Sequence, residues 1–130
     1  MTEFDHETGR SSAHLDYLEG RRAFSACDFE RALVLFQQSR ARDAHFKTSL
    51  LLALTLATRG RDDEAFSAAK EAYQMNPNHS EVAVEYAKVL AKKGERRTAL
   101  AILEAALQRN ATYGPAKRLL HALRGETVDP

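Results

Sequence analysis

One pattern occurs three times in the sequence, and this repetition constrains the fold more than any other feature. The three copies align on central alanines that lie 33 and then 34 residues apart: Ala32, Ala65 and Ala99. A small residue stands twelve positions before each alanine and another seven positions after it; the two sets are Gly20, Ala53, Ala87 and Ser39, Ala72, Ala106. Self-similarity at this period predicts a stack of repeats rather than a closed globule.

The apolar residues between these marks follow a helical spacing. Leu50, Ala53, Leu54 and Ala57 lie three and four positions apart, and no two-residue alternation indicates a strand. Each repeat is therefore predicted to be a pair of antiparallel helices of about 13 residues. The expected helices span residues 13–26, 29–42, 46–59, 62–75, 79–93, 96–109 and 114–124, the last with Pro115 in its first turn.

The small residues are expected where two helices approach most closely, at about 8–10 Å between their axes. Gly20 is predicted to face Ala32 at such a crossing. Gly60 and Gly94 are predicted to end helices in the left-handed conformation, which glycine adopts without a Cβ clash. Cys27 holds the equivalent place in repeat one, where this conformation costs about 1 kcal/mol. The first turn is therefore expected to be less stable or differently shaped, with Cys27 as a small buried residue.

The order of small residue, glycine turn, alanine, large apolar residue, alanine and Pro77 resembles the tetratricopeptide repeat. Repeat two shows it in Leu52, Ala53, Leu56, Gly60, Ala65, Ala72 and Pro77, and repeat three in Tyr86, Ala87, Leu90, Gly94, Ala99, Leu103 and Ala106. The resemblance implies an all-α superhelix, or solenoid, of about seven antiparallel helices. The expected domain spans 13–124, with repeats 13–45, 46–78 and 79–112, a capping helix 114–124, and flexible tails at 1–12 and 125–130.

Charge and cysteine content exclude several classes of partner and setting. Lys and Arg total 19 against 18 Asp and Glu, for a net charge of +1, so no nucleic-acid partner is expected. The longest apolar run, residues 50–57, is far shorter than the about 20 residues of a membrane span. The single Cys27 excludes an internal disulfide, and the polar N-terminus lacks the layout of a signal peptide. A reducing, cytoplasmic setting without membrane insertion is expected.

No convergent set of reactive side chains appears, so neither an enzyme nor a metal or cofactor site is predicted. The five histidines are isolated in the sequence: His6, His14, His45, His79 and His121. None has the spacing of a zinc site. His79 lies in "NPNHSE", where Asn78 or Ser80 is expected to cap the next helix. A hydrolase or redox enzyme would depend on these isolated histidines and on Cys27 alone.

In the family that the sequence resembles, an inner groove lined by the first helix of each pair receives an extended or helical peptide. Carried onto this chain, the partner-binding groove consists of Tyr17, Leu18, Arg21, Phe24, Lys47, Leu50, Leu51, Leu54, Val84, Lys88, Lys92 and Arg118, with His14, Thr58, Glu81, Glu85 and Leu119 beside them. The first two thirds of this face is apolar and the last third is charged. An apolar or amphipathic segment of another protein is therefore expected, with acidic residues at the end near the final lysines.

Two alternatives concern the groove itself. Leu50 and Leu54 either contact a partner or pack between repeats, and the N-terminal segment with Phe4 is a possible occupant of the groove.

Members of the family that bind the C-terminal carboxylate of heat-shock chaperones use Lys, Asn and Arg. The corresponding positions hold Tyr17, Arg21, Leu51, Glu81 and Glu85. Two acidic residues there would repel a carboxylate, so this specificity is not expected.

The leading functional hypothesis is a non-catalytic adaptor or chaperone that holds a peptide segment, similar to chaperones that shield an apolar client before secretion. The alternative is a self-associating scaffold, and hence a homo-oligomer, because a solenoid has open ends. Repeat one is the expected joining end, through exposed Phe29, Leu35 and Phe36.

Overall fold

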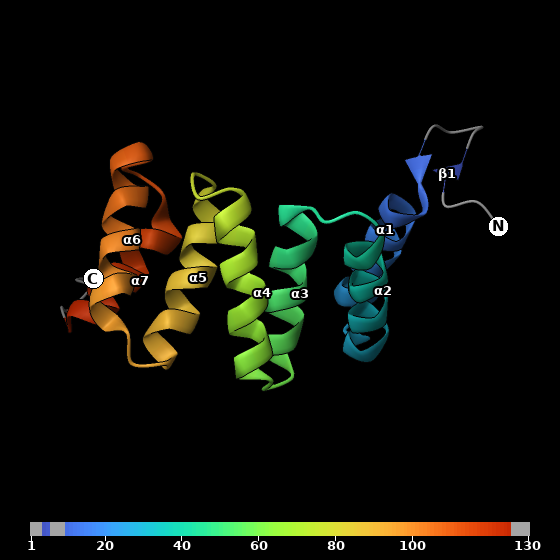
Figure 1. Ribbon diagram of the computed structural model, residues 1–130. Coiled ribbons are helices and arrows are strands. Elements are labelled where there is room, and N and C mark those ends of the chain that lie inside the picture. The colour runs from blue at the N-terminus through green and yellow to red at the C-terminus, as the bar shows by residue number, and fades with distance from the viewer. Residues whose placement is uncertain (1–3, 6–9, 126–130) are drawn as a thin grey trace.

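The computed structural model describes residues 4–5 and 10–125, and seven helices of this part form an antiparallel row (Figure 1). The helices are α1 (Ser12–Ser25), α2 (Phe29–Arg42), α3 (Phe46–Thr58), α4 (Asp62–Met75), α5 (Ser80–Lys92), α6 (Arg96–Arg109) and α7 (Gly114–Arg124). Every predicted helix end lies within one residue of the observed end. The predicted set of seven antiparallel helices is confirmed.

A short strand pair precedes the helices and was not predicted. β1 (Phe4–Asp5) pairs antiparallel with β2 (Arg10–Ser11), with Phe4 opposite Ser11 and Asp5 opposite Arg10. A ladder of two residues per strand is too short to produce an alternation that a sequence can display. The ladder extends away from the row beyond the start of α1 (Figure 1). The rest of the expected tails, residues 1–3, 6–9 and 126–130, lies outside the described residues.

The turn inside each helix pair has the same conformation in all three repeats. Cys27, Gly60 and Gly94 have φ angles of 61°, 74° and 85°. In the first turn the amide of Asp28 donates to the carbonyl of Ala23 at 2.8 Å, as the corresponding amides do in the other two turns. These bonds satisfy carbonyls that the helix end leaves without partners. The expectations of a differently shaped first turn and of a buried Cys27 are wrong, because Cys27 adopts the left-handed conformation and is exposed. The lower stability expected of this turn stays a prediction.

Close helix crossings depend on the small residues of the repeat. The central alanines Ala32, Ala65 and Ala99 are fully buried. A Cβ placed on Gly20 would lie 2.6 Å from Cε1 of Phe36. The nearest side chain to Gly20 is thus Phe36, one turn beyond the predicted Ala32, because the aromatic ring fills the space that glycine leaves open.

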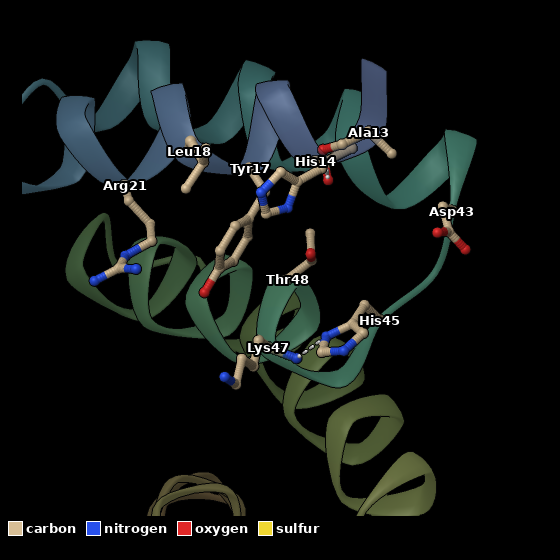
Figure 2. A pocket seen from close by; sticks show the side chains of 10 residues that line it. Ala13, His14, Tyr17, Leu18, Arg21, Asp43, His45, Lys47 and Thr48 are labelled. Carbon is tan, nitrogen blue, oxygen red and sulfur yellow. Dashed lines mark hydrogen bonds between the residues drawn. The ribbon is translucent and has the colours of Figure 1, made fainter. Parts of the chain in front are cut away.

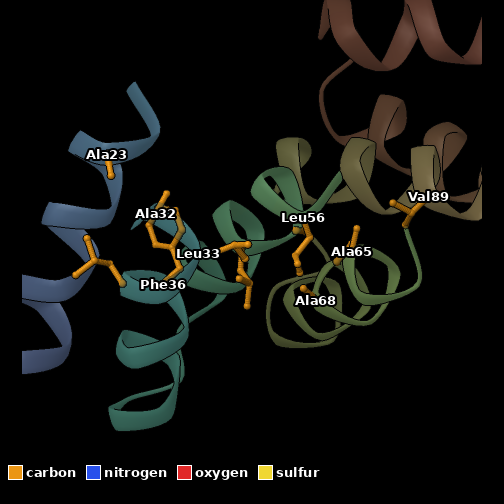
Figure 3. Packing of buried hydrophobic residues seen from close by; sticks show 12 residues of the cluster. Ala23, Ala32, Leu33, Phe36, Leu56, Ala65, Ala68 and Val89 are labelled. Atoms are coloured by element: carbon orange, nitrogen blue, oxygen red, sulfur yellow. The ribbon is translucent and has the colours of Figure 1, made fainter. Parts of the chain in front are cut away.

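The core runs continuously from one repeat to the next. One cluster joins Phe36 and Leu33 of α2 with Leu56 of α3 and Ala68 of α4, and it reaches Val89 of α5 (Figure 3). A second cluster joins α5 and α6 to α7; its buried members are Ala83, Val84, Ala87, Leu90, Ala99, Ile102, Leu103, Ala106, Ala116 and Leu120. Each helix pair therefore buries its apolar face against its neighbours, as a solenoid requires.

A polar network also ties repeat one to repeat two. Arg40 of α2 forms a two-pronged ion pair with Glu71 of α4; its Nε donates to Oε2 at 2.7 Å and its Nη2 to Oε1. The hydroxyl of the buried Ser49 of α3 donates to the same carboxylate at 2.7 Å. Inside repeat one, the hydroxyl of Ser39 donates to the carbonyl of Ala13 at 2.7 Å.

Candidate functional site

The odd-numbered helices form the inner face of the row. α1, α3, α5 and α7 contact one another in succession, whereas α2, α4 and α6 do not pack directly on each other to the same extent. Closer spacing on one side bends the row toward that side. The concave face therefore belongs to the first helix of each pair and to α7.

A pocket of about 390 Å³ lies on this face between α1 and the start of α3 (Figure 2). Its ten lining residues are Ala13, His14, Tyr17, Leu18, Arg21, Ser39, Asp43, His45, Lys47 and Thr48. The pocket combines half-buried apolar side chains with exposed cationic ones. Such a mixture suits an amphipathic ligand.

The wall from α1 is built by helical spacing. His14, Tyr17, Leu18 and Arg21 lie three and four residues apart, so they share one face of the helix. The Tyr17 ring lies 6.3 Å from the Phe36 ring and 6.4 Å from the His14 ring. The guanidinium carbon of Arg21 is 5.9 Å from the Tyr17 ring centre, within cation–π range. Figure 2 shows Tyr17 projecting from α1 toward α3, between His14 and Arg21.

The opposite wall depends on an unusual helix cap. His45 precedes α3, and its Nδ1 accepts a hydrogen bond from the Lys47 amide at 3.1 Å (Figure 2). The cap fixes where α3 begins and so places Lys47 and Thr48 in its first turn, beside the pocket. His79 caps α5 in the same way, accepting from the Val82 amide at 3.4 Å. The predicted caps Asn78 and Ser80 are wrong, since the cap is His79 itself.

The charge of the inner face differs from the sequence expectation. Lys88 pairs with Glu85 at 3.0 Å and Lys92 with Asp62 at 3.7 Å, so carboxylates compensate two of the three cations that were expected to attract an acidic ligand. The third, Arg118, folds back over Gly114: a Cβ built there would lie 3.0 Å from its Nη1. Within the described part of the chain, neither Arg21 nor Lys47 forms an ion pair with a carboxylate. Asp43 is the one carboxylate among the ten lining residues.

Two glutamates act on Tyr113 at the far end of the inner face. Burial raises the pKa of the Tyr113 hydroxyl, the carboxylates of Glu81 and Glu85 add to this rise, and Lys88 opposes it. Tyr113 stands at the start of α7, whereas Glu81 lies in the first turn of α5. The two glutamates therefore place negative charge near the start of α7, which Lys88 partly offsets.

The structure brings part of the predicted groove together. Tyr17, Leu18, Arg21 and Lys47 line the pocket. Phe24, Leu51 and Leu54 are half-buried and pack against the apolar clusters, while Lys88, Lys92 and Arg118 are exposed away from the pocket.

Two predicted groove residues are core residues instead. Leu50 is 4% exposed and packs with Ala72 and Val82, and Val84 is 3% exposed within the second cluster. Neighbouring helices bury both side chains, so neither can contact a partner in this conformation. The packing alternative holds for Leu50. The exposed apolar surface of the groove is accordingly smaller than expected.

Sequence reasoning missed five of the ten pocket residues, which are Ala13, Ser39, Asp43, His45 and Thr48. The repeat period contains a signal for one of them. His45 and His79 lie 34 residues apart and occupy equivalent positions, which marks a shared structural role. The loop between α2 and α3 holds Asp43 and His45, and a search restricted to helix faces passes over it.

Two further features bear on function. In residues 4–5 and 10–125, no helix has both the length and the apolar character needed to cross a membrane. Among the same residues, no three His, Cys, Asp or Glu side chains gather in a way that would hold a metal ion.

Comparison with known proteins decides the family. The sequence profile of the tetratricopeptide repeat matches residues 56–123, slightly more than half of the chain. This chain belongs to the tetratricopeptide repeat family. The resemblance seen in the sequence is thereby confirmed, together with the solenoid fold it implied. No curated protein matches the sequence significantly.

Solved tetratricopeptide domains share this fold at low sequence identity. The first such domain of Spaghetti (RPAP3), bound to the HSP90 peptide SRMEEVD, has a TM-score of 0.82 and 13% identity over 95% of both chains. The domain of Arabidopsis OM64 has a TM-score of 0.79 and 13% identity, covering 87% of this chain and 94% of its own. The TPR2B domain of yeast Sti1, in a complex with pHsp70, has a TM-score of 0.73 and 24% identity, covering 85% and 91%. At these identities the likeness establishes the fold alone.

Proposed function

We propose that this tetratricopeptide repeat protein is a non-catalytic interaction module that holds an apolar or amphipathic segment of a partner protein in its inner groove. It would serve as an adaptor or as a chaperone of the kind that shields clients before secretion. The observation that carries the proposal is the pocket between α1 and α3, where the half-buried Tyr17 and Leu18 adjoin the exposed Arg21 and Lys47. A cytoplasmic setting is part of the proposal, since Cys27 has no disulfide partner.

Two of the similar structures hold heat-shock protein ligands, but we do not extend that specificity to this chain. The acidic Glu81 and Glu85 lie on α5, and Leu51 lies on α3, at positions where carboxylate-binding relatives are expected to carry Lys, Asn or Arg. Like charges on the inner face would repel a free C-terminal carboxylate.

The alternative is a self-associating scaffold, and the residues expected to join its copies are mostly buried. Phe36 is fully buried, Leu35 is 8% exposed and Phe29 is half-buried. The large apolar side chains that are exposed in the described part of the chain are Leu15, Val34 and Met75. Leu15 and Val34 lie in repeat one, the expected joining end, but neither is among the three residues expected to make the contact.

The test is a comparison of proteins captured from a cell extract by wild type and by Leu18→Glu. Leu18 lines the pocket and is absent from the apolar clusters, so a charge there should block binding without unfolding the chain. Leu50→Glu would be uninformative, since it places a charge in the core. Val34→Glu is the matched control, because Val34 is 52% exposed on α2 and does not line the pocket.

We expect Leu18→Glu to lose the captured partners while Val34→Glu retains them, with equal helical circular dichroism in all three proteins. Folded Leu18→Glu that captures the wild-type set would refute the placement of the groove.

A further inference from the structure

The cations of the inner face fall into two groups. Lys88 and Lys92 have carboxylate partners at 3.0 and 3.7 Å. Arg21 and Lys47 form no ion pair among the described residues; the Arg21 guanidinium lies over the Tyr17 ring instead. Arg118 of α7 also forms no ion pair among these residues, but it lies over Gly114. The two cations that share a pocket are therefore Arg21 and Lys47, with Asp43 as the one carboxylate of the lining.

The acidic group lies two helices away along the same face. Glu81 is exposed in the first turn of α5 and has no cationic partner in the described part of the chain. Glu85 stands one turn further on, and its charge is shared with Lys88. The inner face is thus positive at α1 and α3 and negative at the start of α5.

We infer that the segment held in the groove carries an internal Asp or Glu side chain, which enters the pocket beside Arg21 and Lys47, and a Lys or Arg side chain directed at Glu81. Apolar residues next to the acidic one lie on Tyr17 and Leu18. This inference rests on the proposed function and specifies the ligand of the same groove. It reverses the sequence expectation, which placed the acidic end of the ligand at Lys88, Lys92 and Arg118.

The pocket favours a side-chain carboxylate for two reasons. The Arg21 side chain presents a planar fork of donors, which suits a carboxylate, and its cation–π contact with Tyr17 limits the freedom that binding must remove. The segment must also continue across α3 toward α5 to reach Glu81. If the carboxylate in the pocket were the C-terminus of the ligand, the ligand could run from the pocket to Glu81 in one chain direction only. An internal Asp or Glu allows the ligand to run in either direction.

The geometry sets the spacing between the two charges. Packed helices lie about 8–10 Å apart, so the two steps from α1 through α3 to α5 span roughly 16–20 Å. An extended segment rises about 3.3 Å per residue, which places the acidic and basic residues about five or six positions apart. A helical segment rises 1.5 Å per residue and would need about 11–13 positions.

The test is a selection of random 16-residue peptides displayed on phage as internal segments, against wild type and against Arg21→Glu/Lys47→Glu. For wild type we expect enrichment of an Asp or Glu beside apolar residues, with a Lys or Arg at one of the two spacings. The reversed variant should select a basic residue in place of the acidic one. Lys70→Glu/Arg97→Glu carries the same charge change on α4 and α6 and should select the wild-type sequences.

Synthetic copies of the enriched peptides give the quantitative test by fluorescence anisotropy. The acidic peptide should bind Arg21→Glu/Lys47→Glu at least about fivefold more weakly than wild type, with a smaller difference at high salt. Amidation of its C-terminus should leave the affinity unchanged. Loss of binding on amidation would overturn the inference, since a terminal carboxylate would then be the recognised group.

The outcomes separate this inference from the proposed function. Enriched peptides without a charge preference, whose binding is lost in Leu18→Glu, would overturn the inference and leave the groove as the binding site. Selection that enriches no peptide on wild type would count against both.

Discussion

Gly20 lies where α1 passes over the ring of Phe36. A methyl group added there would lie 2.6 Å from the ring, which is buried and has no room to move aside. Overpacking of this kind costs about 1–3 kcal/mol. Gly20→Ala should therefore lower the free energy of unfolding by that amount in urea titrations, although alanine favours a helix.

A second substitution tests the cause of that loss. Phe36→Leu in the Gly20→Ala background should cost less than Phe36→Leu in wild type, because the smaller side chain frees space for the new methyl group. Gln38→Ala, at an exposed position of α2, should stay within about 0.5 kcal/mol of wild type. Additive effects of the two core substitutions would contradict the close approach.

Cys27 occupies a left-handed turn position that the other two repeats give to glycine. A non-glycine residue in this conformation costs about 1–2 kcal/mol, and a substitution by glycine removes this cost. Part of the gain in stability is lost, because glycine has greater conformational freedom in the unfolded chain. Cys27→Gly should therefore raise the free energy of unfolding by about 0.5–1 kcal/mol in urea titrations.

Cys27→Ser is the matched control, because it removes the thiol and keeps the Cβ. It should leave stability close to that of wild type, whereas Gly60→Ala should lower it, since Gly60 has a φ of 74°. Equal stability of Cys27→Gly and Cys27→Ser would indicate that the left-handed conformation of a non-glycine residue costs no free energy at this turn.

At the scale of the elements, Glu71 connects α4 to α2 and α3 and makes their packing depend on pH. The hydrogen bond from Arg40 lowers the pKa of the Glu71 carboxyl below the ordinary 4.5, and the hydrogen bond from the Ser49 hydroxyl lowers it further. Partial burial acts in the opposite direction and raises this pKa. A carboxyl whose pKa is lower in the folded state stabilises the fold above the unfolded pKa. This stabilisation is lost as the pH falls through the folded value.

Glu71→Gln should therefore flatten the dependence of the unfolding free energy on pH below about pH 5, and should destabilise most near neutrality. Glu64→Gln is the control, since Glu64 also has a lowered pKa through its Arg61 hydrogen bond but lies on an exposed surface, where solvent screens the pair. Denaturant midpoints measured across this range check both. The same pH profile for Glu71→Gln and wild type would exclude the network as its source.

The helices were predictable because residues close to each helix end mark it: a glycine, a proline or a change of apolar spacing. The same signals recur in three repeats, so each repeat supports the boundaries predicted in the others. The groove was less predictable. Leu50 and Leu51 are adjacent on the inner helix of repeat two, yet one is buried by the next pair and the other is only half-buried. That division depends on the angle at which repeats stack, which helical spacing does not contain. The ion pair that neutralises Lys92 likewise joins two helices, since Asp62 belongs to α4, and residue spacing within one helix does not predict it.

On the scale of the whole molecule, the two ends of the row differ. At the C-terminal end, α7 buries Ala116 and Leu120 against α5 and α6, and it turns Lys117 and Arg118 outward. A solenoid needs such a polar cover, because the last full repeat would otherwise expose the apolar face made for a successor. We therefore expect α7 to cover this end of the row and to keep it from joining another copy.

Removing α7 by ending the chain after residue 112 should therefore convert the protein into a self-associating species. The truncation uncovers Ala87, Ile102 and other members of the second cluster, and an exposed apolar patch of that size promotes association. Light scattering over a concentration series should show a mass that grows for the truncated chain and stays constant for the full chain. Leu120→Ala in the full chain should cost about 2–3 kcal/mol of stability without association, since α7 remains in place. Growth of the full chain with concentration would favour the scaffold alternative, and a truncated chain that stays monomeric would show that α7 is not the cover of this end.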